Sequence, residues 1–262
     1  MSDLMRGKRG LVMGVANDHS IAWGIAKALA AEGAELAFTY QGHAFERRVR
    51  PLAESLGARL IIDADVQNDA SLDTVCDTLR AEWGTMDFLV HAIAYSDKAE
   101  LTGRFADTTR QNFLRSLDIS CYSFVDSCRR CSELMPDGGA MVTMTYLGAQ
   151  RVMPKYNVMG VAKAALEASV RYLANDLGPH GIRVNAISPG PMRTLAGSAI
   201  SGARQVFKEV GENAPLRTNA TLEHVGGAAV YLLSDLGAST SGDVLFVDGG
   251  YHTLGMAQFE NL

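Results

Sequence analysis

The chain has 262 residues, which is enough for one large domain or two small ones with a buried core. Hydrophobic residues make up 47% and charged residues 20%, a composition typical of globular proteins that excludes a disordered chain. The net charge of −5 offers no general attraction for nucleic acid or for an anionic membrane. Arg217 is the last basic residue, and the net negative charge lies wholly on the acids that follow it: Glu223, Asp235, Asp243, Asp248 and Glu260.

Membrane, secretory and metal-binding classes find no support in the sequence. No stretch of 18 or more uncharged apolar residues is present, and the N-terminus lacks the apolar core of a secretory signal. Four cysteines are too few for a disulfide scaffold in a chain of this length. Cys128 and Cys131 have the spacing of a metal or redox pair, but no second pair or nearby histidine accompanies them. We therefore expect structural thiols, no metal site and a reducing cytoplasm.

Short apolar runs alternate along the chain with longer helical patterns. The expected strands are 10–13, 35–39, 59–63, 88–93, 140–144, 183–187 and 244–247. The expected helices are 21–32, 44–56, 71–83, 112–135, 158–177 and 222–234. Nearly continuous apolar runs are typical of strands covered on both faces, and this alternation favours a parallel sheet. The sequence therefore predicts an α/β fold with a single domain over residues 1–262, built on a Rossmann-type, doubly wound parallel sheet of seven strands with helices on both faces.

The longest stretch without a clear element, Pro189–Gly202, follows a buried strand. Long segments of small residues are uncommon in compact domains unless they are functional lids or disordered. In such sheets, ligands bind at the carboxyl ends of the strands. We therefore expect a substrate lid at about residues 189–210.

The first strand–helix junction has the features of a dinucleotide site, although the usual Gly-x-Gly-x-x-Gly is absent. Gly14 is followed by a five-residue insertion, Val15–His19, and then by Ser20, Ile21 and, three residues later, Gly24. Gly14 allows the backbone to turn under a pyrophosphate, and Ser20 is placed to cap the helix and offer its hydroxyl. Gly24 allows close packing of the helix on the strand.

Two further positions match the adenosine half of such a cofactor. Dinucleotide folds usually place an acid after the second strand for the ribose, or an arginine for a 2′-phosphate. Here Gln41 is placed to bond a ribose hydroxyl, and no Lys or Arg occurs between Gln41 and Arg47. This favours NADH over NADPH, with Arg47 or Arg48 folding back as the alternative. After the third strand, Asp65 is placed to accept from the adenine amino group and Val66 to pack on its face.

The segment Tyr156-Asn-Val-Met-Gly-Val-Ala-Lys163, with Tyr146 ten residues upstream, carries the most specific functional signal. A tyrosine and a lysine seven residues apart on a helix are separated by about two turns and share a face. A nearby ammonium favours a polarised phenolate, and a tyrosine hydroxyl can donate to the negative charge that develops on a substrate carbonyl.

This segment resembles the NADH-type enoyl-acyl carrier protein reductases, divergent short-chain dehydrogenases of bacterial and plastid fatty-acid synthesis. The resemblance extends over essentially the whole chain. Its other motifs here are Gly14 with Ser20-Ile21, Asp65-Val66, His91-Ala-Ile93, Asp118-Ile-Ser, Val184-Asn-Ala-Ile-Ser, Gly190-Pro-Met-Arg-Thr-Leu-Ala and Val247-Asp-Gly-Gly. Ordinary ketoreductases of the superfamily have the lysine four residues after the tyrosine, where this chain has Gly160, which speaks against simple carbonyl reduction.

The resemblance implies transfer of hydride from NADH to the β-carbon of a trans-2-enoyl thioester. Tyr156 would stabilise the enolate oxygen, Lys163 would hold the nicotinamide ribose hydroxyls, and Tyr146 would line the acyl pocket and assist orientation or protonation. Ile93 would pack beside the adenosine and ribose, and Ser96 would contact substrate. The implied lid over nicotinamide and substrate consists of Met192, Arg193, Thr194, Leu195 and Ala196.

The resemblance also implies partners and a location. An acyl carrier protein would deliver the substrate, the chain would form a homotetramer, and the protein would act in the bacterial cytoplasm. Acyl carrier proteins are acidic, and Arg204 and Lys208 would share one face of a helix after the lid, so we expect them to guide this partner. Arg183 is expected to be a structural residue of the sheet.

Some positions depart from the family pattern. Ala94-Tyr95-Ser96 follows the fourth strand, where relatives often have Gly and Phe, and Pro189 and Met192 replace the usual Ala and Ile. Proline fixes its own φ, so Pro189 is expected to stiffen the lid hinge and alter acyl-length preference or lid kinetics. Two alternatives stay open: a related carbonyl reductase, and a nucleotide-binding protein whose catalysis has decayed. His91 is expected to be a packed core residue.

Overall fold

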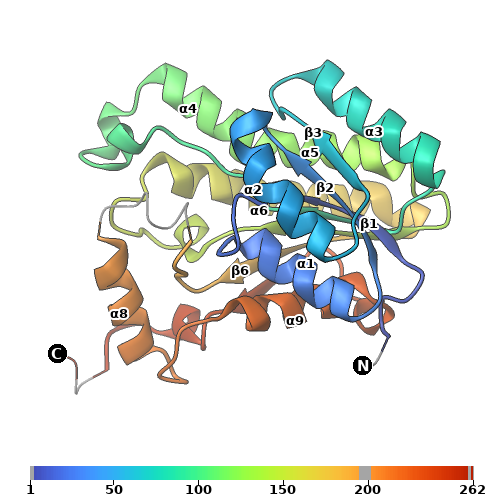
Figure 1. Ribbon diagram of the computed structural model, residues 1–262. Helices are drawn as coiled ribbons and strands as arrows, with labels where there is room; N and C mark the ends of the chain where they lie inside the picture. Colours follow the sequence, from blue (N-terminus) through green and yellow to red (C-terminus); the bar gives the residue numbers. More distant parts are fainter. Residues whose placement is uncertain (1–2, 195–201, 259–260, 262) are drawn as a thin grey trace.

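The computed structural model describes residues 3–194, 202–258 and 261, and one parallel sheet organises them (Figure 1). Its strand order is β3-β2-β1-β4-β5-β6-β7, and every neighbouring pair is parallel. The strands are β1 Arg9–Met13, β2 Glu35–Tyr40, β3 Leu60–Asp63, β4 Phe88–His91, β5 Gly139–Met144, β6 Ile182–Pro189 and β7 Val244–Val247. This confirms the predicted seven-stranded α/β sheet.

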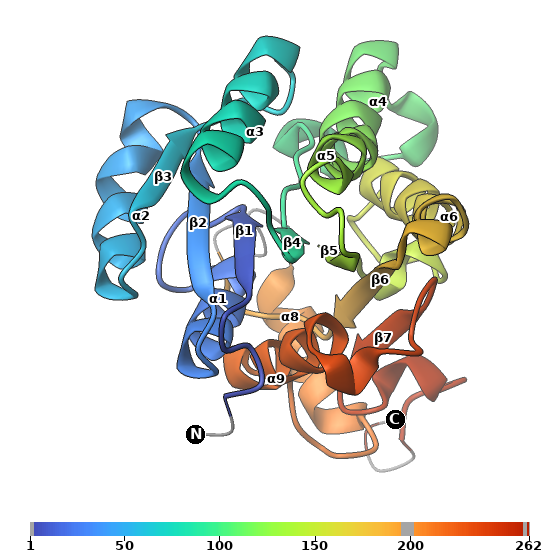
Figure 2. The same ribbon diagram turned by 90° about the vertical axis from the view of Figure 1, so that its right-hand side faces the viewer.

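Helices cover both faces of the sheet, as Figure 2 shows in the view along the strands. The helices are α1 Ile21–Ala31, α2 Gly42–Ser55, α3 Asp69–Trp83, α4 Arg110–Leu117, α5 Ser123–Ser132, α6 Val158–Leu177, α8 Ala203–Asn213 and α9 Leu222–Leu233. Helices α1, α2 and α9 pack on one face, and α3, α5 and α6 pack on the other. Among these described helices, none is long and apolar enough to cross a membrane.

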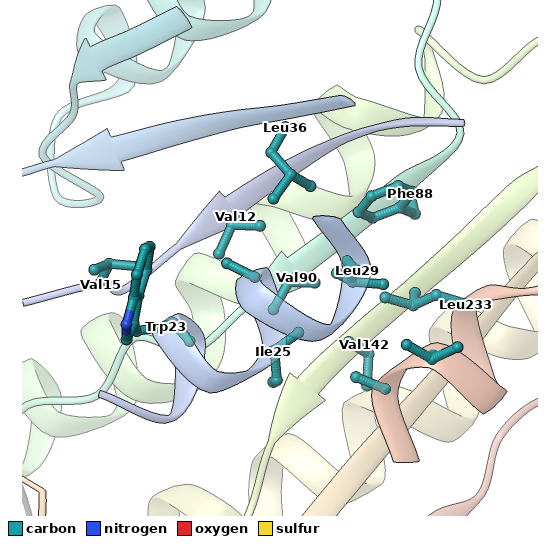
Figure 3. Close-up of a cluster of buried hydrophobic side chains, with 14 of the residues drawn as sticks. Val12, Val15, Trp23, Ile25, Leu29, Leu36, Phe88, Val90, Val142 and Leu233 are labelled. Carbon is teal, nitrogen blue, oxygen red and sulfur yellow. The ribbon is translucent and has the colours of Figure 1, made fainter. Parts of the chain in front are cut away.

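Each strand contributes to both cores because successive side chains point to opposite faces. Val12 and Val90 face α1 and α9, where they meet Ile25 and Leu29 (Figure 3). Their neighbours along the strands, such as Leu89, face α3, α5 and α6. Burial of one such aliphatic side chain contributes about 1.5–3 kcal/mol. The two cores fix the sheet, and with it the edge where the carboxyl ends of the strands meet.

Gly24 has a different role from the one predicted. A Cβ at this position would lie 2.7 Å from the Cβ of Leu222, the first residue of α9. On the opposing helix, a Cβ at Gly226 would lie 2.8 Å from the Cβ of Ala28. The expected helix–strand packing was therefore wrong at Gly24, because the two glycines allow α1 and α9 to approach each other.

Several predicted boundaries differ from the structure. The single helix expected over 112–135 is two helices joined by a π-helical turn, Asp118–Tyr122. Strand β4 ends at His91 rather than at residue 93, and β6 continues to Pro189, which pairs with Val247. Pro189 is thus the last residue of β6, and its expected effect on the lid hinge stays a prediction. Helix α8 occupies part of the expected lid range.

Candidate active site

Tyr146 and Tyr156 form the centre of the candidate active site. Tyr146 follows β5, and Tyr156 lies two residues before α6. Their rings meet edge to face, with centroids 5.1 Å apart and an interplanar angle of 71°. Burial, with a further effect of Tyr251, raises the pKa of Tyr146 to about 12. Burial and the neighbouring Tyr146 raise the pKa of Tyr156 above its usual range, so both hydroxyls remain protonated hydrogen-bond donors at neutral pH.

Two glycines explain how the rings come together. A Cβ at Gly148 would lie 2.4 Å from Cδ1 of Tyr156. A Cβ at Gly160, on α6, would lie 2.8 Å from the carbonyl oxygen of Gly148. The turn after Tyr146 therefore packs directly on α6. This contact also accounts for the absence of lysine four residues after Tyr156, because any side chain at 160 meets the backbone of the turn.

Lys163 lies inside the protein, with 5% of its surface exposed. Its Nζ donates to the carbonyl oxygen of Met144, the last residue of β5, at 2.8 Å. Burial lowers the pKa of Lys163 to about 8, although Cys121 and Glu167 favour the ammonium form. Tyr156 precedes α6, so the expectation that tyrosine and lysine share one helix was wrong, and Asn157 between them has a positive φ of 40°.

Glu167 was not predicted. It lies one turn after Lys163, is 5% exposed, and accepts hydrogen bonds from the side chains of Thr145 and Gln150. Its sequence signal is weak, since an acid in an alanine-rich helix is ordinarily exposed. The one sequence feature that could have indicated Glu167 is its position four residues after Lys163, on the same face of the helix.

The segment after β4 is held by polar residues of α4 and of the π-helical turn. Ser96 Oγ donates to Oδ1 of the buried Asn112 at 3.3 Å and accepts from Ser116 Oγ at 2.8 Å. Ser120 Oγ accepts from the amide of Tyr95 and donates to its carbonyl oxygen, both at 3.0 Å. The position of Ser96 is therefore set by its neighbours, while its contact with substrate stays a prediction. Ile93 is half-buried against the adjacent core.

At the junction of β1 and α1, the backbone has the shape that the sequence indicated. Gly14 has φ +103°, and a Cβ there would lie 2.3 Å from the carbonyl oxygen of Ala92, so only glycine fits. Ser20 is the N-cap residue of α1, which begins at Ile21, but its hydroxyl does not cap the helix. It accepts from the amides of Ala16 and Asn17 at 3.0 and 3.1 Å instead. The expected cap was wrong because the insertion before Ser20 competes for the same oxygen.

The adenosine-side residues lie in more open surroundings. Gln41 is exposed and is the N-cap residue of α2. Arg47 donates to Nε2 of His43 at 3.1 Å, so in this structure it is engaged on its own helix. Asp65 Oδ1 accepts from the amide of Gln67 at 3.0 Å. Val66 is half-buried on the core.

The structure describes only the first part of the predicted lid contacts. Met192 packs on the core, and the amide of Thr194 donates to the carbonyl oxygen of Met192 at 2.9 Å. The guanidinium carbon of Arg193 lies 4.7 Å from the ring centroid of Phe207 on α8. Leu195 and Ala196 lie outside the described residues.

Several other residues with reactive or charged side chains have structural roles. His91 is fully buried, with Nε2 2.9 Å from Ser123 Oγ, and burial together with Lys163 lowers its pKa to about 3. Arg183 donates to the carbonyl oxygens of Leu232 and Ser234, which confirms its structural role. The four cysteines are buried free thiols, and no cluster that could hold a metal occurs in the described part of the chain.

Comparisons with known proteins identify the family. The model of a family described as enoyl-(acyl carrier protein) reductase matches residues 14–252. The chain is 58% identical to an NADH enoyl-acyl carrier protein reductase of Rhizobium meliloti, over 100% of this chain and 98% of the relative. The crystal structure of the Anaplasma phagocytophilum reductase in complex with NAD has a TM-score of 0.95 and 56% identity, covering 97% of both chains. FabI of Candidatus Liberibacter asiaticus has a TM-score of 0.97 and 48% identity, covering 98% of this chain and 100% of that one. The chain belongs to the enoyl-acyl carrier protein reductase family.

Proposed function

We propose that this protein reduces trans-2-enoyl thioesters of an acyl carrier protein, with NADH as the hydride donor. The packed pair of protonated tyrosines, followed along the chain by the buried Lys163 on α6, carries this proposal. NADH, when bound, supplies the hydride that adds to the β-carbon. The protein then has to stabilise the negative charge that appears on the thioester oxygen, which a correctly placed hydroxyl donor does, until a proton adds to the α-carbon and completes the reduction.

Each residue of the central group has a proposed role. Tyr156 donates to the enolate oxygen, because its hydroxyl keeps its proton at neutral pH. Tyr146 lines the acyl pocket and orients Tyr156 through their edge-to-face contact. Lys163 binds the ribose hydroxyls next to the nicotinamide, and Ser96 contacts substrate. Their common position at the carboxyl edge of the sheet is where parallel α/β folds bind ligands.

The cofactor residues fit a dinucleotide without 2′-phosphate. At Gly14 a Cβ would meet Ala92, so the backbone there remains bare for close approach of a pyrophosphate. Gln41 offers an uncharged amide to the ribose, while Asp65 and Val66 are available to the adenine. The other proposed cofactor contacts are Ile21, Ile93 and the segment from Met192 to Ala196. The proposed lid over cofactor and substrate spans about residues 189–210.

We propose that α8 guides the acyl carrier protein. Arg204 and Lys208 are exposed and lie one turn apart on this helix. Exchange of both for glutamate is expected to lower kcat/KM with crotonyl-acyl carrier protein about tenfold and to leave crotonyl-CoA reduction nearly unchanged. The matched control is Arg59→Glu, since Arg59 is exposed at the opposite, amino end of β3. Equal losses with both substrates would contradict the proposal.

The proposed assembly is a homotetramer in the bacterial cytoplasm. Large apolar side chains remain exposed on α4, the π-helical turn and α6: Leu114 is 59%, Tyr122 56% and Tyr172 75% exposed. Exposed apolar side chains on elements that contact one another are suited to burial between subunits. The free thiols are consistent with a reducing compartment. Light scattering of the wild type and of Tyr172→Glu tests the assembly.

One experiment tests the proposed reaction. Oxidation of NADH is followed by absorbance with crotonyl-CoA and with acetoacetyl-CoA. The proposal expects turnover of the crotonyl thioester and none of the acetoacetyl thioester. Turnover of acetoacetyl-CoA alone would establish a carbonyl reductase, whereas NADH binding without turnover of either would establish a nucleotide-binding protein.

A further inference from the structure

Glu167 is a buried carboxylate that the reaction described above does not use. It projects from α6 with 5% exposure, and its two oxygens accept from different donors. Thr145 Oγ1 donates to Oε1 at 2.9 Å, and Gln150 Nε2 donates to Oε2 at 3.0 Å. A carboxylate is rarely buried without a reason, because its desolvation is costly unless hydrogen bonds and nearby positive charge compensate.

The two donors flank Tyr146 in the chain. Thr145 directly precedes it, and Gln150 ends the short turn that follows it. One helical turn before Glu167, Lys163 holds the carbonyl oxygen of Met144. Helix α6 therefore fastens the segment 144–150 at three points, and Tyr146 lies between them.

The same carboxylate is part of the electrostatic surroundings of Lys163. The charged and titratable groups that face this ammonium are His91 from β4, Cys121 from the π-helical turn and Glu167 from α6 itself. His91 is neutral above a pKa of about 3, and burial raises the pKa of the Cys121 thiol. The charge that favours the ammonium at neutral pH is thus that of Glu167.

We propose that Glu167 is a positioning residue of the active site, which holds Tyr146 against α6 through Thr145 and Gln150 and keeps Lys163 protonated. The proposal rests on the function proposed above for Tyr146 and Lys163. It adds a residue that touches neither substrate nor cofactor but determines the position of Tyr146 and the charge of Lys163. Its two effects are separable, because one depends on hydrogen bonds and the other on charge.

Three substitutions separate the two effects. Thr145→Val removes one hydrogen bond and preserves side-chain shape and the charge of Glu167. Glu167→Gln removes the charge, while its amide oxygen still accepts from Thr145 and its NH₂ can donate to a flipped Gln150 amide. Glu167→Ala removes both. A displacement of about 1 Å at a reacting group costs up to about 100-fold in rate.

The expected results differ between the variants. Thr145→Val should lower kcat for crotonyl-CoA about tenfold, and Glu167→Ala about 100-fold, as the ring of Tyr146 loses its support. Glu167→Gln should keep kcat within about threefold of wild type at pH 7. In that variant the pH above which NADH affinity falls should move down from about 8, because Lys163 loses its neighbouring negative charge. NADH fluorescence measures this affinity without turnover.

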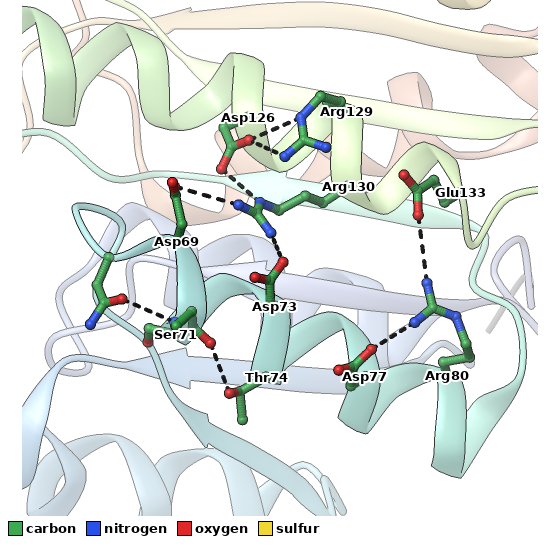
Figure 4. A network of polar contacts seen from close by, with 12 residues as sticks. Asp69, Ser71, Asp73, Thr74, Asp77, Arg80, Asp126, Arg129, Arg130 and Glu133 are labelled. Atoms are coloured by element: carbon green, nitrogen blue, oxygen red, sulfur yellow. Dashed lines mark hydrogen bonds and ion pairs between the residues drawn. The ribbon is translucent and has the colours of Figure 1, made fainter.

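A matched control is available on the neighbouring helix. Asp126, on α5, is also a buried carboxylate, 4% exposed, and it binds Arg130 and Arg129 in a network that joins α5 to α3 (Figure 4). Asp126→Asn should lower the melting temperature and leave kcat, KM and the pH dependence of NADH affinity unchanged. If Glu167 had only a structural role, its substitutions would likewise lower the melting temperature and leave kcat, KM and the pH dependence of NADH affinity unchanged.

The outcomes are decisive in each case. The proposal is overturned if Thr145→Val and Glu167→Ala retain the wild-type kcat and KM, or if Glu167→Gln leaves the pH dependence of NADH affinity in place. If the wild type turned over no enoyl thioester, the proposed function would fail, but the NADH titrations would still decide whether Glu167 controls Lys163. Should Glu167→Ala not fold, Thr145→Val and Glu167→Gln carry the test.

Discussion

The two halves of the ligand-binding edge are built differently. On the side of β5 and α6, Tyr156, Lys163 and Glu167 are 8%, 5% and 5% exposed and are held by contacts between separate elements. On the side of β2 and β3, Gln41 is exposed and Asp65 is bonded within its own loop. The side chains proposed for catalysis are thus held by contacts within the protein, and preorganised dipoles of this kind need no rearrangement during reaction. In the half proposed for adenosine, we expect the cofactor itself to be the partner of the exposed polar groups.

Tyr156→Phe should have the largest effect in the molecule. It removes one hydroxyl from a buried site and leaves the ring packing with Tyr146 and Gly148 intact. Loss of one donor to a developing oxyanion costs about 100- to 1,000-fold in kcat. The melting temperature and the affinity for NADH should stay near wild type. Steady-state kinetics with crotonyl-CoA and an NADH fluorescence titration measure both, and an unchanged kcat would remove Tyr156 from the chemistry.

Gly160→Ala tests the packing that brings the tyrosines together. The new Cβ would lie 2.8 Å from the Gly148 carbonyl oxygen, so the turn after Tyr146 has to shift. Overpacking of this kind costs about 1–3 kcal/mol, which outweighs the roughly 1 kcal/mol that alanine gains over glycine in a helix. We expect lower stability in urea and a reduced kcat.

The control for this substitution is Gly227→Ala. Gly227 lies on α9 and is exposed, and a Cβ added there would have no other atom within 4 Å. At this position the helical preference of alanine acts alone and should stabilise the protein by up to about 1 kcal/mol. If both variants gained stability, the turn would not be in the tight contact with α6 that the structure shows.

The buried Lys163 should also make stability depend on pH. Its pKa is about 8 in the folded protein against 10.5 for an ordinary lysine. Below pH 8 both states carry the proton, but between pH 8 and 10 the unfolded chain holds more protons than the folded one. The contribution of Lys163 to the free energy of unfolding therefore rises with pH in this window, by up to about 1.4 kcal/mol per unit.

Lys163→Met should abolish this increase, and urea denaturation of both proteins between pH 7 and 10 measures it. Above pH 10 the raised pKa values of Tyr146 and Tyr156 add a dependence of opposite sign, because the unfolded chain loses these protons before the folded one does. The comparison therefore ends at pH 10. A parallel pH dependence in the wild type and the variant would mean that Lys163 is not the titrating group.

The sequence predicted regular elements better than the contacts between them. The bounds of α6 and β7 agree with the expected ranges, because continuous apolar patterns with clear ends determine both. The π-helical turn Asp118–Tyr122 could not be predicted, since its residues also fit an ordinary helix. The role of Glu167 depends on partners that only the folded chain brings near, and that of Ser20 on the local turn that the insertion before it forms.

The same reasoning explains which site residues a pattern can reveal. Tyr146, Tyr156 and Lys163 stand out because their side chains suit a reaction and their spacing is specific. Gly148 and Gly160 matter through a distance between two backbones, which spacing does not encode. Sequence motifs therefore indicate the groups that we propose to act, and the structure adds the residues that hold them in place.

Gln41→Ala should have the smallest effect, because it lies in the exposed half of the site. Loss of one hydrogen bond of an uncharged amide to a ribose hydroxyl costs about 0.5–1.5 kcal/mol, which corresponds to a two- to tenfold weaker binding of NADH. The measured quantity is the KM for NADH at saturating crotonyl-CoA, with kcat as the internal control. If the two halves are as independent as their contacts indicate, kcat stays constant. A fall in kcat equal to that in affinity would mean that the adenosine half also arranges the nicotinamide, and the preorganisation assigned to α6 would then depend on the cofactor.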